Sequence, residues 1–392
     1  MGYDAPFKDI KVVDLSQGVA GPYSAMLLAQ YGANVIKVEP HDGDWSRFIS
    51  TRYEDHSAFS VPANLGKRSI SLDLKSEAAK KAVERIIADA DVFIEGFRPG
   101  VIERLGFGYD AVSAINPGII YLSISGFGQV GPYRERPAMD PILQAFTGLM
   151  SQNKGFDDIP HRVGVIVSDM TTALYAFQSV AVSLYAKRDE PKGRHIDVSL
   201  MQGTACLQVI RMIMTHLSGG EAKPGRIPAG SFETSDGWIY FLLFKESEWA
   251  PLCDMLDLNY LRDDPRYADN ASRLENQDEL MPIVQTAFRK MTSDQCCEKL
   301  AEARIMHEKV NEYTDFLRHP QVEATGLIAW LDQPGIGKVP VPNAPGIMPL
   351  VSGTPLAMSP LVGEHSEAIL SEHGYSADEI SRLISDGVVK VA

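Results

Sequence analysis

The chain has 392 residues, more than one compact core usually holds, so two domains are predicted. Its formal net charge of −14 argues against a nucleic-acid or anionic-membrane partner, because both bind basic surfaces. Hydrophobic residues make up 45% of the chain, as in ordinary globular proteins. The sequence shows neither a signal-peptide pattern nor a long apolar run, so we expect a cytoplasmic protein that does not enter the membrane.

The first half of the chain alternates short apolar runs with helical patterns. Residues 11–15 predict a strand, 17–22 a turn, 23–32 a helix and 34–39 a second strand. Such a unit forms a parallel strand pair with a right-handed crossover. Gly32 suits the end of the helix, because glycine tolerates the left-handed conformation found there.

The same alternation continues through the first half of the chain. Further strands are predicted at 69–74, 91–97, 118–125 and 195–200, and further helices at 76–90, 140–151, after Asp169 and at 201–217. Repeated alternation of this kind predicts an α/β fold with a Rossmann-like open parallel sheet.

A change of composition marks the end of the large domain, which we place at 1–217. Glycine and proline crowd residues 218–230, which predicts a linker. A smaller α+β domain is then expected over 231–325. It opens with a hairpin that turns at Ser235–Gly237. The remaining segment, 326–392, is rich in proline and ends in one more helical pattern.

Four cysteines are present, of which Cys296 and Cys297 are adjacent. None forms a CxxC pair or a His/Cys spacing typical of a metal site, so we expect reduced thiols and no metal ion. Neither G-x-S-x-G nor H-E-x-x-H occurs, which disfavours a serine hydrolase and a zinc peptidase.

Two glycine-containing turns follow predicted strands. The turn SQGVAGPYSAM (16–26) opens a helix, and backbone N–H groups at a helix N-terminus favour phosphate, although a turn without a ligand explains it equally well. The run SGFGQVG (125–131) contains G-x-G-x-x-G. A dinucleotide site also needs a helix at the third glycine and a later acidic residue. PYRERPAMDP follows instead, so a nicotinamide cofactor is disfavoured, and the glycines are expected to allow close approach of a ligand or another chain.

Charged residues near predicted strand ends supply further candidates. These are Lys67, Arg68, Lys75, Arg98 and Arg104. In an acidic protein they suggest an anionic ligand, although surface ion pairs account for any one of them. Asp169 precedes a long helical stretch, where Ser168 or Asp169 suits the N-cap because a side-chain oxygen there accepts a hydrogen bond from backbone N–H. The alternative is that Asp169 takes part in a reaction.

Several motifs, in their order and spacing, resemble the family III CoA-transferases of CaiB/BaiF type. This family includes formyl-CoA transferase, crotonobetainyl-CoA:carnitine CoA-transferase and the related α-methylacyl-CoA racemases. The motifs are VVDLSQGVAGPYSAMLLAQYGANVIKVE, GKRSISLDLK, DVFIEGFRPGVIERLG, NPGIIYLSISGFGQVGPY, the SDM around Asp169 and GRHIDVSLMQGTA. The resemblance runs from about residue 8 to 210 and resumes at ETSDGWIYF.

The resemblance implies that Asp169 is a nucleophile. It would attack the thioester carbonyl of a donor acyl-CoA and give a mixed anhydride, from which CoA thiolate would form an aspartyl-CoA thioester. The acceptor carboxylate would then attack this thioester and finally take the CoA. Amide groups at the start of the following helix would stabilise the charge that develops at the carbonyls. Asp169 would then occupy a position that suits both a helix cap and the nucleophile.

The resemblance also implies a coenzyme A site and a homodimer of two interlocked ring-shaped chains. By position, the CoA contacts are Val19 and Ala20; Leu72, Asp73, Leu74 and Lys75; Gly96, Phe97 and Arg98; Arg104 near the nucleotide phosphates; and Arg136, Pro137, Ala138 and Met139 over the pantetheine arm. It further implies that residues 326–392 return to the large domain. The implied partners are therefore an acyl-CoA, a small carboxylic acid and a second copy of the chain.

Two departures from the family pattern bear on the reaction. The racemases use a His immediately before an Asp as one of two acid/base groups, and Met139 stands in its place. Methionine carries no proton, which favours a transferase over a racemase. A glycine run that closes over the nucleophile in formyl-CoA transferase is replaced by PGRIPAGSFET (224–234), which disfavours the formyl/oxalate substrate pair.

Three alternatives to a CoA-transferase stay open on the sequence. They are an acyl-CoA racemase or isomerase of the same superfamily, a nicotinamide-dependent dehydrogenase, and a CoA-binding protein without activity. The first lacks a proton-carrying group at Met139, and the second lacks the helix expected after Gly131. The third gives Asp169 no role beyond that of a helix cap.

Overall fold

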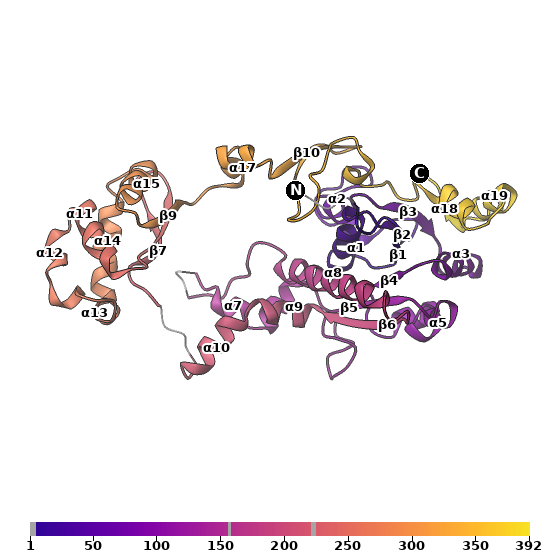
Figure 1. Cartoon of the computed structure of the whole chain (residues 1–392), viewed down its shortest axis with the longest axis horizontal. Coiled ribbons are helices and arrows are strands. Elements are labelled where there is room, and N and C mark those ends of the chain that lie inside the picture. Colours follow the sequence, from indigo (N-terminus) through magenta and orange to yellow (C-terminus); the bar gives the residue numbers. More distant parts are fainter. Residues whose placement is uncertain (1–4, 156–157, 221–224) are drawn as a thin grey trace. The chain divides into compact units, whose positions relative to one another are not determined.

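The computed structural model describes residues 5–155, 158–220 and 225–392 (Figure 1). The chain divides into two compact units, of which the first contains the chain up to Val209 and again Thr325–Ala392. The second unit is Ile210–Ala324. Residues 221–224 of the predicted linker lie outside the described residues.

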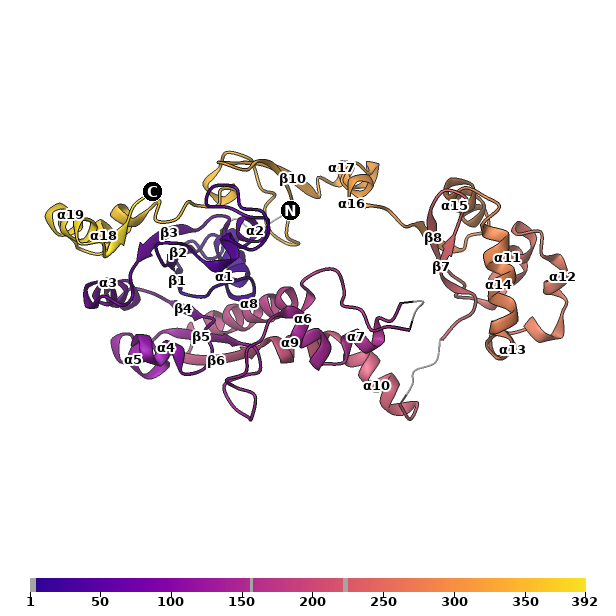
Figure 2. The ribbon, with the colours of Figure 1, turned by 180° about the vertical axis from the view of Figure 1, so that it is seen from behind.

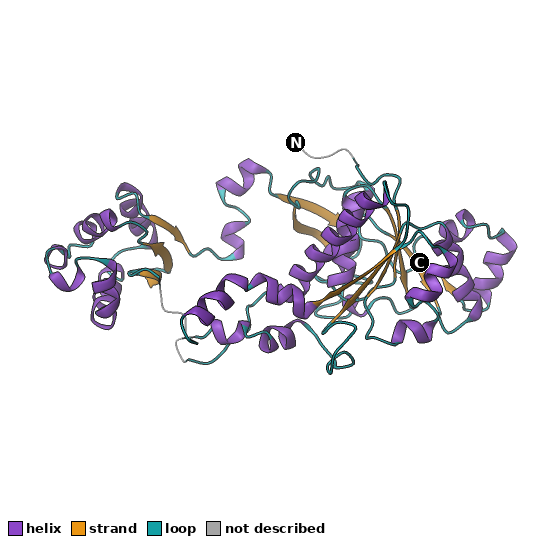
Figure 3. Ribbon diagram, turned by 60° about the horizontal axis from the view of Figure 1, so that its bottom comes forward, coloured by secondary structure: helices purple, strands orange, loops and turns teal. Residues whose placement is uncertain are grey.

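A mostly parallel sheet forms the centre of the first unit (Figure 3). Its strands are β1 (Lys11–Asp14), β2 (Asn34–Glu39), β3 (Arg68–Leu72), β4 (Val92–Glu95), β5 (Ile120–Ser125), β6 (Arg194–Ser199) and β12 (Val389–Lys390). Within the described residues their order is β12-β3-β2-β1-β4-β5-β6, and only the β12–β3 pair is antiparallel. The order of the six parallel strands is that of doubly wound sheets with a switch point between β1 and β4. The predicted Rossmann-like sheet is confirmed.

Helices cover both faces of this sheet. The helices of the first unit are α1 (Ala20–Gln30), α2 (Ser60–Asn64), α3 (Glu77–Ala88), α4 (Val101–Leu105), α5 (Tyr109–Ile115), α6 (Asp140–Phe146), α7 (Leu149–Gln152), α8 (Val167–Lys187), α9 (Leu200–Leu207), α18 (Ser366–Glu372) and α19 (Ala377–Ser385). All of α10 (Val209–Leu217) except its first residue belongs to the second unit. Along β1, Val12 packs with α1 and α8, whereas Val13 packs with α3 and α18 on the opposite face. This alternation follows from the two-residue period of a strand and gives the unit one core on each side. The pair α1 and α8 lies side by side in both views (Figures 1 and 2).

The C-terminal segment contributes more structure than the sequence pattern predicted. A hairpin of β10 (Ile328–Gln333) and β11 (Gly337–Pro342) packs Leu331 against Met26 and Leu27 of α1. The tail then forms two helices, α18 and α19, where one was predicted, and β12 pairs with the edge strand β3. The sequence predicted a single helix there, because the two short apolar patterns on either side of Gly374 were interpreted as one.

The second unit contains a three-stranded antiparallel sheet of β7 (Ala229–Glu233), β8 (Trp238–Leu242) and β9 (Met306–Lys309). The predicted hairpin with its turn at Ser235–Gly237 is confirmed. Its helices are α11 (Trp249–Met255), α12 (Asn259–Arg262), α13 (Asn270–Glu275), α14 (Gln277–Phe288), α15 (Ser293–Glu302) and α16 (Tyr313–Phe316), and α17 (Pro320–Thr325) leads back to the first unit. Three phenylalanines, Phe232, Phe241 and Phe288, pack with ring centroids 4.6–5.2 Å apart at the centre of its core. Among the described residues, no helix is long and apolar enough to cross a lipid bilayer.

A buried ion pair fastens the loop after β2 to the sheet. Both side chains, Arg47 and Glu39, are fully buried, and the guanidinium donates to the carboxylate at 2.8 and 2.9 Å. The same guanidinium donates to the carbonyl oxygens of Asp55 and Pro360, so it joins the loop to the C-terminal segment. Removal of a single partner would leave a buried charge without its counterion.

Substitution of Arg47→Met therefore lowers the free energy of unfolding of the first unit by about 3–5 kcal/mol. The control is Arg68→Met, which breaks an Arg–Glu pair with Glu372 whose side chains are 24% and 51% exposed. That change costs about 0–1 kcal/mol, because exposed pairs contribute little. Urea unfolding followed by circular dichroism measures both. Equal losses in the two variants would contradict this account of the loop.

Candidate active site

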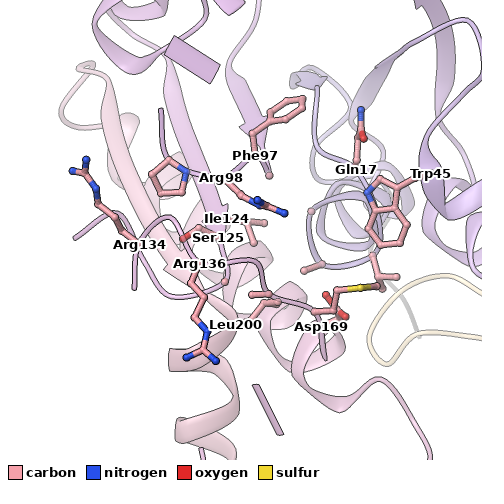
Figure 4. Close-up of a pocket in the computed structure, with 18 residues that line it drawn as sticks. Gln17, Trp45, Phe97, Arg98, Ile124, Ser125, Arg134, Arg136, Asp169 and Leu200 are labelled. Carbon is pink, nitrogen blue, oxygen red and sulfur yellow. The ribbon is translucent and has the colours of Figure 1, made fainter. Parts of the chain in front are cut away.

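A cavity opens at the carboxyl ends of β1, β4 and β5, beside the switch point where open α/β sheets bind ligands. Its lining contains Gln17, Val19, Ala20 and Gly21 after β1, Gly96, Phe97, Arg98 and Pro99 after β4, Ile124, Ser125 and Gly126 at the end of β5, and Trp45, Arg134, Arg136, Ala138, Met139, Asp169 and Leu200 (Figure 4). We call this the Asp169 cavity.

A second cavity lies at the carboxyl ends of β1, β2 and β3. Its lining contains Leu15, Gln17, Val38, Glu39, Pro40, His41, Leu72, Asp73, Leu74, Lys75, Phe97 and Leu105. Gln17 and Phe97 line both cavities, so the two adjoin along the edge of the sheet where the parallel strands end. An elongated ligand that reaches both would pass these two side chains.

The structure brings most of the sequence-predicted residues to these two cavities. Val19, Ala20, Gly96, Phe97, Arg98, Arg136, Ala138, Met139 and Asp169 line the Asp169 cavity, and Leu72, Asp73, Leu74 and Lys75 line the second. Arg104 and Pro137 line neither of them. Arg104 is exposed in the last turn of α4, next to Leu105 of the second cavity, and Pro137 stands between two lining residues.

Asp169 lies in the first turn of α8. The interpretation of Ser168 or Asp169 as the N-cap is wrong, because the helix already begins at Val167 and its N-cap is Ile166. The carboxylate of Asp140 satisfies this end of the helix instead. It accepts from the backbone N–H of Ser168 at 2.6 Å and of Asp169 at 3.4 Å. The Asp169 side chain is therefore free to face the cavity.

A second helix N-terminus also reaches the Asp169 carboxylate. The backbone N–H of Ala20, the first residue of α1, donates a hydrogen bond to it. Gly21, the next residue, lets the start of α1 pack closely on the preceding turn, since a Cβ there would lie 2.3 Å from the side chain of Ser16. The amide groups at both helix ends carry partial positive charge, which suits a carboxylate and any oxyanion formed from it.

The pKa of Asp169 is raised from its usual value near 3.8 to about 7. Burial is the largest cause, the negative charge of Asp140 is the second, and the hydrogen bond from Ala20 opposes both. Asp140 itself is buried and accepts from the side-chain amide of Gln144 at 2.6 Å. Two carboxyl groups thus share one end of α8, and the negative charge of Asp140 favours the protonated form of Asp169.

Arginine side chains line the Asp169 cavity away from Trp45 (Figure 4). Arg134 forms an ion pair with Glu135 at 2.9 Å. Arg136 lies over the ring of Tyr133, with 4.8 Å from its guanidinium carbon to the ring centroid. In the described part of the chain no carboxylate forms an ion pair with Arg98 or Arg136, so both remain available to an anionic ligand.

Sequence analysis missed several residues of this site. Gln17 lies inside the predicted ligand turn but was not singled out, and Asp140 starts a helix whose capping of α8 is a long-range contact. Trp45, Arg134 and Leu200 carry no local pattern that points to a cavity. Only the order of the strands brings them together.

Gly126, in the glycine run after β5, allows a close approach within the chain. A Cβ there would lie 2.2 Å from the Cβ of Ala138, so the glycine lets residues 126–139 fold back on themselves, and Gly126 also lines the Asp169 cavity. The expected close approach of a ligand or another chain stays a prediction. This segment contains no helix, and α6 begins only at Asp140. Met139, at the place of the racemase histidine, lines the Asp169 cavity without a titratable group.

Comparisons with known proteins agree with this architecture. Residues 7–366 match the family described as CoA-transferase family III. Human succinyl-CoA:glutarate CoA-transferase is 32% identical over 404 residues, which cover 98% of this chain and 90% of the relative. Acetyl-CoA:oxalate CoA-transferase of Acetobacter aceti is 33% identical over 331 residues, or 82% and 85% of the two chains. The crystal structure of a CAIB/BAIF family protein from Brucella suis has a TM-score of 0.83 at 30% identity, and covers 95% of this chain and 100% of that one.

The raised pKa of Asp169 predicts a pH-dependent effect on stability. The unfolded carboxyl ionises near its usual pKa of 3.8 and the folded one near 7, so the wild type loses stability as the pH rises between these values. Asp169→Asn has no such loss. The difference in free energy of unfolding between this variant and the wild type therefore shifts in favour of the variant by about 2 kcal/mol between pH 5 and pH 8. Urea unfolding at both pH values measures it, with exposed Asp9→Asn as the control. An advantage that does not change with pH would contradict the raised pKa.

Proposed function

The chain belongs to the family III CoA-transferases, and on that premise we propose that it moves CoA from an acyl-CoA donor to a dicarboxylic acid through a covalent thioester on Asp169. One observation carries this proposal. A carboxylate that titrates near neutral pH lies at two helix N-termini, in a cavity beside the switch point of the sheet. As an acyl-CoA:carboxylate CoA-transferase, the enzyme exchanges a thioester for a carboxylate and needs no ATP.

The first half of the reaction loads CoA onto the enzyme. An oxygen of ionised Asp169 attacks the thioester carbonyl of the donor, the carbon–sulfur bond breaks, and a mixed anhydride and CoA thiolate result. The thiolate then attacks the aspartyl carbonyl. The anhydride bond breaks, the donor leaves as its free acid with one oxygen from Asp169, and the aspartyl-CoA thioester remains.

The second half runs the same chemistry in reverse with the acceptor. The acceptor carboxylate attacks the aspartyl carbonyl, which releases CoA thiolate and gives a second mixed anhydride. The thiolate attacks the acceptor carbonyl, so the new acyl-CoA leaves and Asp169 is regenerated as a carboxylate. Each attack places negative charge on a carbonyl oxygen next to the N-terminal amide of α1 at Ala20, which stabilises it.

The two cavities suggest how an acyl-CoA is held. The nucleotide end fits the second cavity, where Lys75 supplies a cation, and the pantetheine arm passes Phe97 toward Asp169. Arg98 and Arg136 are the available cations closer to the nucleophile. The proposed arrangement accounts for the separation of the predicted CoA residues into two groups along the sheet edge.

The class of acceptor follows from the relatives and from the charge of the cavity. The two relatives described above are named for glutarate and oxalate, which are both dicarboxylic acids. A dicarboxylic acid keeps one free carboxylate after its other end has reacted. The arginines that line the Asp169 cavity offer a counter-charge for that group.

We also propose that two copies of the chain assemble as a homodimer. Leu174, Tyr175, Val182 and Tyr185 follow one face of α8 and are 39–69% exposed. Contiguous apolar side chains on a helix face typically mark an interaction surface. The interlocked arrangement of family members would cover this face.

Mixing the enzyme with an acyl-CoA and no acceptor accumulates a covalent CoA adduct on Asp169. Intact-protein mass spectrometry after rapid quenching detects it, and peptide mapping locates it. Asp169→Ala forms no adduct and loses transferase activity by at least ~10⁴-fold, because the covalent route is absent. Asp9→Ala, which removes an exposed carboxylate that lines neither cavity, is the control and still forms the adduct. An adduct of equal yield in Asp169→Ala would contradict the proposal.

The pH profile tests the electrostatics of the nucleophile. Asp169 reacts as the carboxylate, so kcat/KM for the donor falls as the pH drops through about 7. Asp140→Asn removes the like charge beside Asp169 but retains an oxygen that accepts from the helix amides. The acidic limb of the profile then moves to lower pH. A limb that stays in place would show that Asp140 does not tune the nucleophile.

A further inference from the structure

Trp45 is a large apolar side chain that the fold holds partly in the open. Its indole is 40% exposed and lines the Asp169 cavity, but not the second cavity. In Figure 4 it lies on the same side as Asp169, across the cavity from Arg134 and Arg136. Contact with a ligand in this cavity would account for the exposure of the tryptophan.

Buried charges anchor the chain on both sides of Trp45. The carboxylate of Asp44 is fully buried and accepts from the backbone N–H of Gly18 at 2.9 Å and from Lys37 at 2.9 Å. On the other side, Arg47 is fixed by its pair with Glu39. The exposure of Trp45 therefore does not come from a loose loop.

The indole is also fixed with respect to the nucleophile. It lies directly on Gly18, where a Cβ would be 2.3 Å from its ring. Two residues later, Ala20 donates its N–H to Asp169. A backbone segment of three residues thus joins the ring to the carboxylate that reacts, which sets where an acyl group meets the ring.

We propose that Trp45 determines acyl specificity. On the proposed function, its indole forms the apolar wall for the methylene chain of the acyl group on Asp169, so methylene-containing dicarboxylic acids are favoured over oxalate. The CoA arm reaches Asp169 past Phe97 from the second cavity, which Trp45 does not line, and this leaves the indole to the acyl group. Each methylene transferred from water to such a wall is worth about fourfold in affinity, and oxalate has none to transfer.

The test is a comparison of acceptors. For a reaction with a covalent enzyme–CoA intermediate, kcat/KM for the acceptor does not depend on the donor. We would measure it for oxalate, malonate, succinate and glutarate with one fixed acyl-CoA. In the wild type it rises along this series. Trp45→Ala lowers the value for glutarate about tenfold and that for oxalate less than threefold, and Trp45→Phe restores most of the loss because a ring is retained.

Controls separate this proposal from the one on which it rests. Trp330→Ala removes a tryptophan of similar exposure, 45%, on β10, and leaves the ratio of glutarate to oxalate unchanged. Circular dichroism shows whether Trp45→Ala is folded. If it is not, Trp45→Gln, which replaces the ring by a polar side chain, is used in the same comparison and is expected to show the same selective loss for glutarate. An equal loss for all four acids would overturn the role of Trp45 while Asp169 chemistry stands. Transfer that survives in Asp169→Ala would overturn the proposed function itself.

Discussion

Asp169 lies where the N-termini of two helices meet, and the site depends on that junction. The first turn of α8 supplies the carboxylate, and the first residue of α1 donates a hydrogen bond to it through Ala20. The two helices belong to different crossovers of the sheet and start at its reactive edge because all its central strands are parallel. Strand order therefore decides the chemistry, since it alone brings residue 20 next to residue 169.

A set of buried charges holds the turn that carries Ala20. Below the turn, Lys37 donates to the carbonyl of Ser16 and to the carboxylate of Asp44, and Asp14 accepts from Lys67 at 2.7 Å. Burial lowers the pKa of Lys67 to about 8, although Asp14 opposes the shift. Charged groups without water are costly for stability, and here they fix a turn that an apolar core would leave free to move. The same anchors fix Trp45 over the cavity.

The sheet and the residues that line the two cavities at its edge were largely predictable because their signals are local. The buried strands β1, β2 and β5 are short apolar runs, and Ser76 at the start of α3 is an ordinary helix cap. The helix predicted at 23–32 begins three residues earlier, at Ala20, because Ala20, Gly21 and Pro22 were interpreted as a turn, and it ends two residues earlier, at Gln30.

The contacts that complete the site were beyond local patterns. Asp140 stabilises a helix that begins 27 residues later, and Trp45 enters the cavity from a single turn of 3-10 helix, Trp45–Arg47. The role of Asp169, the proposed nucleophile, was ambiguous on the sequence, because an acid near a helix start suits a cap as well as a reaction. The structure removes the cap interpretation by giving that task to Asp140.

Oxygen transfer tests the central claim most directly. Turnover with acyl-CoA and an acceptor whose carboxylate is labelled with ¹⁸O places acceptor oxygen in Asp169, because the aspartyl carbonyl is attacked and the anhydride is then cleaved. The peptide that contains Asp169 gains one heavy oxygen and then a second as turnover continues. In later turnovers Asp169 passes labelled oxygen to the donor acid that is released. Label in the donor acid with none in Asp169 would contradict a covalent route through this residue.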